Sequence, residues 1–231
     1  MTCSAVVRDY IIPTSMGALV KSKVEVPELV AKRRSQFIDA AITLFGKSGY
    51  HVTTIREIAK IAGVSIGLIY QYVQDKEDIL LLALLQVLDS YKQRIPQALE
   101  GIEHPIDRFS AAVYAYCQVN DENVNATVLA YRETKSLCKE RRALIQQQEV
   151  ETNALISDCI GKCIGAGFFK PDIDVELFTY QIVMFSHAWA LKAWRFRSTM
   201  TVDEYVNRGL NLMLQSVLST KGKRAFNRKV A

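Results

Sequence analysis

Residues 53–76 read TTIREIAKIAGVSIGLIYQYVQDK, and this stretch decides the fold. Thr54 is followed three residues later by Glu57, a capping box that predicts the start of a helix. The apolar residues that follow recur at the spacing of one helical face: Ile55, Ile58, Ala59 and Ala62. The stretch therefore begins with a short amphipathic helix.

A tight turn and a second helix follow. Gly63 suits the left-handed residue that ends a helix, and Ser65 can cap the next one. Ile69 and Val73 lie four residues apart, so both can point inward together with Val64. The remaining positions of this second helix are predicted to be exposed to varying degrees: Ser65, Ile66, Gly67, Leu68, Tyr70, Gln71 and Tyr72.

Two helices joined by a short glycine turn form a helix-turn-helix, whose second helix enters the major groove of DNA. Gly67 allows a close backbone approach, and Gln71 can pair with adenine, while Leu68 or Ile66 can touch a thymine methyl. The Tyr70 and Tyr72 hydroxyls and the Lys76 ammonium suit phosphate oxygens. Double-stranded DNA is thus the expected partner, with these DNA-binding residues: Arg33, Arg34, Thr53, Thr54, Ser65, Ile66, Gly67, Leu68, Tyr70, Gln71, Tyr72 and Lys76. An ordinary pair of packed helices is the alternative.

The segment over residues 32–80 resembles the N-terminal domain of TetR/AcrR-type transcriptional repressors. The residues that carry the resemblance are Phe37, Ala40, Ala41, Leu44, Phe45, Gly49, Tyr50, Thr53, Thr54, Ile58, Ala59, Ala62, Gly63, Val64, Ser65, Gly67, Tyr70, Tyr72 and Lys76. Ile69 and Val73 depart from it, because the family more often has leucine and phenylalanine there. The resemblance implies an all-helical dimer with a small-molecule pocket in its C-terminal part.

The chain has 231 residues, of which 49% are hydrophobic, enough for two domains. We expect an all-α fold with an N-terminal three-helix helix-turn-helix domain (27–76) and a larger helical ligand-binding and dimerisation domain (77–220). Residues 1–26 show no clear period and are expected to form a mobile arm, in which Met16 is a second candidate start. Residues 221–231 are expected to form a basic, solvated tail.

The net charge of +5 is unevenly distributed. Residues 1–76 carry ten Lys/Arg against six Asp/Glu, residues 77–220 fourteen against eighteen, and residues 221–231 five against none. Lys32, Arg33 and Arg34 open the first predicted helix, where the family commonly places cations against phosphates. A solvated helix face is the alternative for this triplet, as it is for the tail, which otherwise adds weak nonspecific attraction to DNA.

No segment has the length and apolar character of a membrane span, and residues 1–26 lack the pattern of a secretory signal. We therefore expect a cytoplasmic protein without a membrane partner. Five cysteines, Cys3, Cys117, Cys138, Cys159 and Cys163, are expected to be reduced thiols that pack as small hydrophobes. No metal or other cofactor is expected. The alternative is a redox- or metal-responsive regulator that uses Cys159 and Cys163, which are one helical turn apart, together with His187.

Helical periodicity continues to the end of the chain. Asp75 and Asp78 predict the cap of a long helix that ends near Pro96 and joins the two domains as a lever. Further helices are expected over residues 107–120, 125–134, 139–165, 174–196 and 202–220, and no segment has the pattern of a strand.

The helix over 174–196 is apolar on nearly every side, so it must be buried by two partners, its own subunit and a second one. Thr201 and Glu204 cap the last predicted helix, in which Gly209 and Ser216 allow close helix approach. In the family the last two helices form a four-helix dimer interface. We therefore predict a homodimer through Trp194, Tyr205, Gly209, Leu212, Met213 and Ser216.

An apolar cavity with a few polar groups is predicted for a small-molecule effector, although each of its residues also suits plain core: Phe109, Tyr114, Cys117, Tyr131, Met184, Phe185, His187 and Trp189. Two segments, YRETKSL from Tyr131 and HAWALKAWRFR from His187, resemble a TetR subgroup linked to fatty-acid and acyl-coenzyme A metabolism. That resemblance implies an acyl-CoA effector, whose phosphates would meet the cations Arg132, Lys135, Lys192 and Arg195.

The leading hypothesis is a repressor that its effector releases from a palindromic operator. A ligand-dependent activator has the same DNA chemistry and differs only in the sign of the coupling. An enzyme is disfavoured, because the sequence shows no partnered nucleophile and base, no phosphate-binding glycine loop and no zinc-protease motif.

Overall fold

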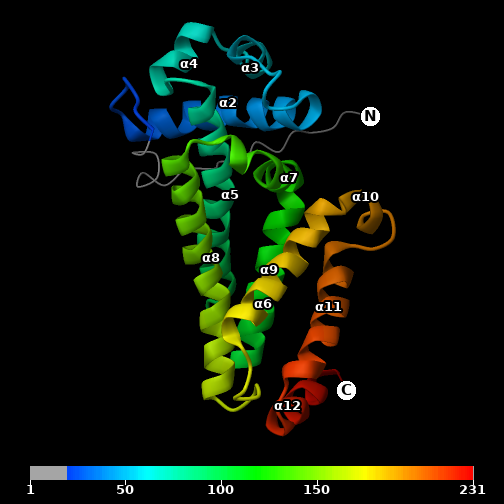
Figure 1. The fold of residues 1–231 in the computed structure, drawn as a ribbon. Helices are drawn as coiled ribbons and strands as arrows, with labels where there is room; N and C mark the ends of the chain where they lie inside the picture. Colours follow the sequence, from blue (N-terminus) through cyan, green and yellow to red (C-terminus); the bar gives the residue numbers. More distant parts are fainter. Residues whose placement is uncertain (1–19, 231) are drawn as a thin grey trace.

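A computed structural model of the chain describes residues 20–230, with side chains described as far as residue 226. The N-terminal domain consists of α2 (Pro27–Ser48), α3 (Ile55–Ala62) and α4 (Ile66–Tyr72) at one end of the molecule (Figure 1). Pro27 occupies the first turn of α2, where its missing N–H leaves no hydrogen bond unmade. The predicted three-helix domain is thus present.

The predicted caps are confirmed at both ends of α3 and at the start of α4. Thr54 and Glu57 form the reciprocal capping box at the start of α3. Gly63 ends α3 with φ 67°, a left-handed conformation that a residue with a Cβ adopts only under strain. Ser65 then caps α4 by accepting a hydrogen bond from the N–H of Leu68. Local chemistry alone therefore fixes where α3 ends and α4 begins.

The connecting helix α5 (Lys76–Ala98) leaves α4 and runs down the middle of the larger domain (Figure 1). Asp75 caps α5 by accepting a hydrogen bond from the N–H of Asp78, as predicted, and Pro96 lies in the last turn. Every residue over 78–91 is buried, because α5 packs against α2, α6, α7 and α8. Movement of α5 therefore has to be accommodated by both domains.

The larger domain continues with α6 (Pro105–Glu122), α7 (Val124–Glu133), the 3-10 turn η1 (Thr134–Ser136) and α8 (Lys139–Gly165). These bounds differ from the predicted ranges by at most two residues, and α8 matches its range. In the described part of the chain there is no strand, although Phe169 and Leu218 form an isolated antiparallel bridge. No helix there is long and apolar enough to cross a membrane.

The prediction of a single helix over residues 174–196 is wrong. The chain forms α9 (Val175–Leu191) and the short α10 (Ala193–Phe196), separated at Lys192, which has φ −118° and ψ 27°. Beyond the break Arg197 returns to Asp121, the carboxylate that also accepts a hydrogen bond from Trp189 Nε1 at 2.7 Å. The apolar pattern continues through the break, so periodicity alone did not reveal it.

The last helix and the tail also differ from expectation. Helix α11 (Val202–Val217) ends before the extended residue Leu218, and the predicted tail forms a helix, α12 (Thr220–Val230), whose described cations Lys221, Lys223 and Arg224 are exposed. Gly222 of α12 is buried so close to the Phe168 carbonyl that an added Cβ would lie 2.1 Å from its oxygen. Helix α12 lies at the end of the molecule opposite α4 (Figure 1), far from the segment that the sequence predicts to contact DNA, so the predicted attraction of the tail to that DNA is not supported.

Residues 20–26 are not a mobile arm. The N–H of Lys23 donates a 2.8 Å hydrogen bond to the carbonyl of Gln71, and Val20 is buried. This part of the predicted arm therefore packs on the end of α4. Residues 1–19, with Cys3 and Met16, lie outside the described residues.

Candidate functional site

The exposed side of α4 is polar and is held by an apolar opposite side. Ile69 and Val73 are fully buried, as predicted, which turns Ser65, Gly67, Tyr70 and Gln71 toward solvent. Ile66 and Leu68 are only half-buried and pack partly against the core. The four solvent-facing positions are therefore the ones that α4 offers to a partner.

A hollow of about 570 Å³ lies between α4 and the start of α3. Thr54 and Arg56 line it from α3, and Ile66 and Tyr70 line it from α4. Sequence reasoning missed Arg56, although an exposed cation in the first turn of the helix before the glycine turn was a usable signal. Arg56 and Tyr70 place a cation and a hydroxyl on either side of this hollow, a combination that suits a phosphate.

Arg34 is not a surface cation, and its predicted DNA contact is wrong. Its side chain is 1% exposed and donates from Nε and Nη2 to the carbonyl of Tyr72, and from Nη2 to that of Val20. Arg33, by contrast, is partly exposed and reaches only Gln36 of its own helix, at 3.1 Å. Consecutive residues of a helix are about 100° apart, which is enough here for Arg34 to face the core and hold α4 while Arg33 is partly exposed to solvent.

Two further predicted DNA contacts are corrected by burial. Thr53 is 2% exposed, and its hydroxyl donates to the carbonyl of Gly49 at 2.8 Å. Tyr72 is 3% exposed, unlike its neighbours Tyr70 and Gln71, so its hydroxyl is not presented on the exposed side of α4. Thr54 remains exposed, but its hydroxyl is engaged in the capping box with Glu57.

Lys76 has a structural role, and it also lines the hollow with Arg56 and Tyr70, so its predicted phosphate contact stays a prediction. Its ammonium group donates to the carbonyls of Tyr50, His51 and Thr53 at 2.8, 3.0 and 2.9 Å. An ammonium has three protons, so these bonds use all of them. Lys76 therefore ties the start of α5 to the turn between α2 and α3.

In the larger domain, a polar cluster surrounds His187 of α9. The Tyr131 hydroxyl lies 2.8 Å from His187 Nδ1, and the Tyr116 hydroxyl lies 3.4 Å from its Nε2 and 3.3 Å from Asn153 Oδ1. Burial lowers the pKa of His187 to about 4, so the imidazole is neutral at physiological pH. Asn153 Nδ2 is buried without a hydrogen-bond partner, a donor left for an additional acceptor.

The same cluster extends to residues that sequence reasoning missed. The Tyr91 hydroxyl donates to Asn120 Oδ1 at 2.8 Å, and the Thr127 hydroxyl donates to the same oxygen at 3.1 Å. Burial, followed by the nearby carboxylate of Glu149 of α8, raises the pKa of Tyr131, and burial raises the pKa of Glu149 itself. Polar residues at core-facing positions of α6 and α7 were the available signal, although spacing alone does not show that they meet.

Only part of the predicted effector set gathers at this cluster. Tyr131, Met184 and His187 lie together, and Cys117 reaches Ser186, the residue before His187, at 3.3 Å. The other four have partners elsewhere in the domain. Phe109 packs on Phe169 and Phe178, Tyr114 bonds Asp203, Phe185 stacks on Tyr205, and Trp189 bonds Asp121. The predicted cations Arg132, Lys135, Lys192 and Arg195 are all exposed.

Some of the predicted dimer residues are exposed, whereas others are buried within the subunit. Trp194 and Leu212 are 78% and 74% exposed, Met213 is half-buried, and Ser216 is exposed. Tyr205 is buried within its own subunit, and a Cβ on Gly209 would lie 2.2 Å from the Phe185 ring, so both face α9. These two residues are therefore corrected to packing contacts within one chain.

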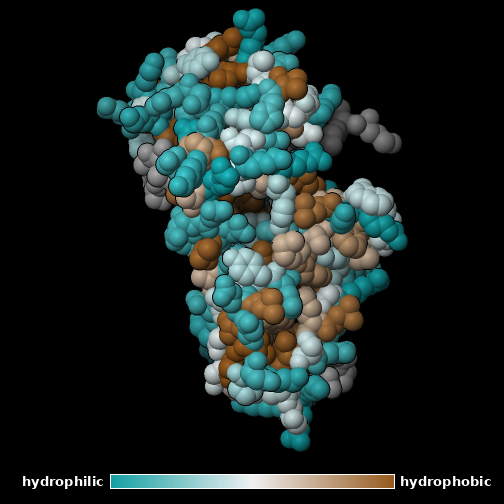
Figure 2. Space-filling view, viewed as in Figure 1, coloured by the Kyte–Doolittle hydropathy of each residue, from teal (hydrophilic) through white to brown (hydrophobic). Residues whose placement is uncertain are grey.

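Exposed apolar side chains also lie on α9, which contacts α11. Leu177 and Met184 of α9 are 57% and 48% exposed, and both occupy one face of that helix with Tyr180. Figure 2 shows hydrophobic side chains gathered over the lower half of the molecule, where α9 lies. Large exposed side chains of this kind on neighbouring helices indicate an interaction surface.

The cysteine pair does not have the character of a redox or metal site. Cys159 and Cys163 are buried, and burial raises the pKa of both thiols, that of Cys163 to about 12. A thiol held protonated is a poor metal ligand and a poor nucleophile. No group of three or more metal-binding side chains occurs among residues 20–226.

Comparison with known proteins identifies both domains. Residues 37–83 match the model for bacterial regulatory proteins of the tetR family, and residues 103–194 match a tetracyclin repressor-like C-terminal domain. The HTH-type transcriptional regulator HbdR of Aromatoleum sp. (strain CIB) is 52% identical over 212 residues, which cover 92% of each chain.

Two further likenesses are more distant. The HTH-type transcriptional repressor KstR2 of Mycolicibacterium smegmatis is 22% identical, with 86% of this chain and 97% of the relative covered. A solved tetR-family regulatory protein from Rhodococcus RHA1 superposes with a TM-score of 0.73 at 25% identity, with 82% of this chain and 98% of that chain covered. The exposed polar side of α4, the buried helix α5 and these matches agree, and the chain belongs to the TetR family of bacterial transcriptional regulators.

Proposed function

We propose that the protein is a dimeric repressor whose two α4 helices read a palindromic DNA operator, and that a small molecule bound in the larger domain lowers its affinity for that operator. The observation that carries the DNA part is the division of α4. Ile69 and Val73 anchor the helix, while Ser65, Gly67, Tyr70 and Gln71 face outward. A short helix held from behind, with an exposed polar side, suits insertion into a major groove.

Within this surface, each side chain has a distinct task. Arg33, Arg56 and Tyr70 would contact phosphates, which give affinity but little sequence information. Gln71 would read a base, because its amide can donate to and accept from adenine at once. Gly67 has no side chain and would let the helix backbone approach the groove wall. Ser65 and Thr54, as caps, would set the angle at which the two helices meet the duplex.

The homodimer is proposed from the apolar surface of α9 and α11. Leu177, Met184 and Leu212 are all close to half exposed or more. A two-fold dimer through this surface would bury them and would present two copies of α4 to two half-sites. Trp194 is the most exposed of the large apolar side chains described and would add contact area at the edge.

The effector is proposed to bind beside His187. The cluster there combines tyrosine hydroxyls, a neutral imidazole and the unpartnered Asn153 amide, the mix of apolar walls and few polar groups found in ligand sites. An acyl-CoA is our specific proposal. It is supported by the resemblance of residues 131–137 and 187–197 to acyl-CoA-linked regulators. The exposed cations Arg132 and Lys135, one and four residues after Tyr131, also suit phosphates.

The same geometry argues against catalysis. Burial raises the pKa of the Cys117 thiol to about 12, so it is protonated, and its hydrogen bond goes to Ser186 rather than to a base. His187 is neutral and is bonded to tyrosine hydroxyls, which are weak acids. We therefore propose a regulator that acts in the cytoplasm, where operator DNA is accessible, and assign no reaction to it.

Selection of duplexes from a random pool, followed by titration with ligands, tests this function. The native chain should enrich a palindromic duplex, and at least one compound from a panel of short, long and aromatic acyl-CoA thioesters should weaken binding roughly 5- to 150-fold. Coenzyme A and the corresponding free acids are the controls. Failure to enrich any duplex would refute the DNA-binding part, and enrichment without an effect of any thioester would refute the proposed effector.

A further inference from the structure

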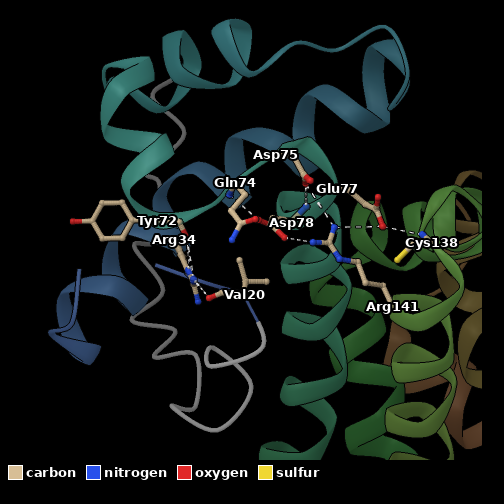
Figure 3. A network of polar contacts seen from close by, with 9 residues as sticks. All are labelled: Val20, Arg34, Tyr72, Gln74, Asp75, Glu77, Asp78, Cys138 and Arg141. Atoms are coloured by element: carbon tan, nitrogen blue, oxygen red, sulfur yellow. Dashed lines mark hydrogen bonds and ion pairs between the residues drawn. The ribbon is translucent and has the colours of Figure 1, made fainter. Parts of the chain in front are cut away.

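The junction between the recognition helix and the lever, residues 72–78, is held from two directions by two arginines (Figure 3). From within the N-terminal domain, Arg34 of α2 grips the Tyr72 carbonyl at the end of α4. From the larger domain, Arg141 in the first turn of α8 reaches the carboxylates that begin α5. The first arginine lies in the N-terminal domain, whereas the second lies in α8 and reaches the residues at which α5 begins.

Arg141 contacts three carboxylates at once. Its Nη2 forms an ion pair with Asp78, and its Nη1 lies 3.3 Å from Glu77 Oε1 and 3.6 Å from Asp75 Oδ1. The same Glu77 oxygen accepts a 2.8 Å hydrogen bond from the N–H of Cys138 at the start of α8. A planar guanidinium with five donors can satisfy such a group of carboxylates, whereas a single ammonium cannot.

Asp78 is the central member of this contact. It is 2% exposed, and its Oδ2 accepts a 2.7 Å hydrogen bond from the N–H of Gln74, in the two-residue link between α4 and Asp75. Asp75 in turn caps Asp78, so the carboxylates and the link form one closed unit. A shift of Arg141 would thus change the support of a buried charge that fixes the exit of α4.

Helix α8 also borders the His187 cluster. Asn153, three turns along α8 from Arg141, accepts a hydrogen bond from Tyr116, whose hydroxyl is 3.4 Å from His187 Nε2. Arg141 and Asn153 belong to one unbroken helix, Lys139–Gly165. Displacement of α8 by a molecule bound beside His187 would therefore reach Arg141 without passing through a loop.

We propose that Arg141 is a positioning residue that couples the effector site to the recognition helix, by clamping the Asp75–Asp78 unit to α8 in the DNA-binding state. This inference rests on the proposed function, since it assigns a residue to the coupling within it. The clamp acts through Asp78 and the Gln74 link, and Arg141 itself contacts neither DNA nor the effector.

The chain offers a matched control. Lys92 of α5 forms a 2.7 Å ion pair with Glu151 of α8, so it joins the same two helices. That pair lies well beyond the 72–78 junction and has no contact with it. Lys92→Ala therefore removes this ion pair and the 2.7 Å hydrogen bond from Lys92 Nζ to Gln148 of α8, and leaves the clamp intact.

Hydrogen exchange of the free protein tests the clamp without DNA or effector. Arg141→Ala should raise amide exchange over residues 66–78 on the order of tenfold, and Lys92→Ala should not. Arg141→Lys, which retains the charge but not the fork, should restore part of the protection. If Arg141→Ala does not fold, Glu77→Gln is the milder variant, since it weakens the clamp without leaving a buried charge unpaired.

Coupling is then measured with the duplex and the acyl-CoA selected by the native chain. Arg141→Ala should bind the acyl-CoA within about threefold of the native affinity. In this variant the acyl-CoA should weaken duplex binding less than about threefold, against 5- to 150-fold in the native chain. Unchanged exchange over 66–78, an equal response of Lys92→Ala, or full coupling in Arg141→Ala would overturn the proposal. If the native chain binds no duplex, the proposed function fails, whereas the exchange result still decides whether the clamp exists.

Discussion

Arg34 donates two hydrogen bonds, of 3.2 Å from Nε and 2.9 Å from Nη2, to the carbonyl of Tyr72 at the end of the recognition helix. Arg33, the adjacent residue, has its side chain on the solvent side of α2. Two neighbouring arginines therefore have opposite roles, one in stability and one in proposed DNA contact.

Arg34→Met should lower the free energy of unfolding by about 2–4 kcal/mol, because it leaves the buried carbonyls of Val20 and Tyr72 without donors. Chemical denaturation measures this loss. Arg33→Ala should leave stability within about 0.5 kcal/mol of the native value. Instead, it should reduce the slope of log affinity against log salt by about 1.8 for a dimer, as two phosphate contacts are lost. Equal stability losses in both variants would contradict this division.

Lys76→Met should destabilise the protein by about 2–3 kcal/mol, because three carbonyls between α2 and α3 lose their donor. The salt dependence of duplex binding should be unchanged, since all three protons of the ammonium are already donated to carbonyls. Lys60→Met is the control, an exposed lysine on α3 whose removal should change stability by less than about 0.5 kcal/mol. A reduced salt slope in Lys76→Met would instead support Lys76 as a DNA contact.

His187 should give the protein a pH-dependent stability that His187→Gln removes. The folded pKa of about 4 lies below that of an unfolded histidine, about 6.5, so between these values the unfolded chain binds more protons. Stability therefore falls as the pH drops through this window, by up to about 3 kcal/mol. Burial raises the pKa of Asp89 to about 6, so Asp89 makes the opposite contribution and stabilises the fold as the pH drops. The informative quantity is therefore the difference between the stability-against-pH curves of the native chain and the variant. Parallel curves from pH 7.5 to pH 4 would show that the imidazole is not buried in its neutral form.

Leu212→Glu should convert the dimer to monomers. A carboxylate at the centre of an apolar interface cannot be solvated there, and we expect association to weaken on the order of 100-fold or more. Val150→Glu provides the control, because Val150 is 54% exposed on α8, outside the proposed interface. Sedimentation of both variants at micromolar concentration measures whether each is a monomer or a dimer. A dimeric Leu212→Glu, or a monomeric native chain, would exclude this surface.

Local chemistry made much of the N-terminal domain predictable. The Thr54–Glu57 box, the left-handed Gly63 and the Ser65 cap each depend on residues within a few positions, and all three occur as expected. Exposure was predicted less well. Periodicity indicated that α4 has an outer side, but the burial of Tyr72 and Arg34 depends on residues 20–26 and on α2, which sequence spacing does not place.

The larger domain shows the same limit. Helices of the right length were predicted, but the break at Lys192 and the helix α12 depend on contacts with Asp121 and Phe168, far away in sequence. The predicted effector residues scatter for the same reason. Aromatic side chains on several helices suit a cavity equally well by composition, and only the fold shows that Tyr131 and Tyr116 meet at His187.

Hydroxyl-radical footprinting of the selected duplex, with the native chain and Gln71→Ala compared on every single-base variant, tests the central claim most directly. The account predicts two protected half-sites related by a two-fold axis, on one face of the duplex at a separation of whole helical turns, about 10 bp each. It also predicts that Gln71→Ala loses base preference at one position in each half-site. A single unpaired footprint, or base preferences that Gln71→Ala leaves unchanged throughout, would contradict the assignment of α4 as the helix that reads DNA.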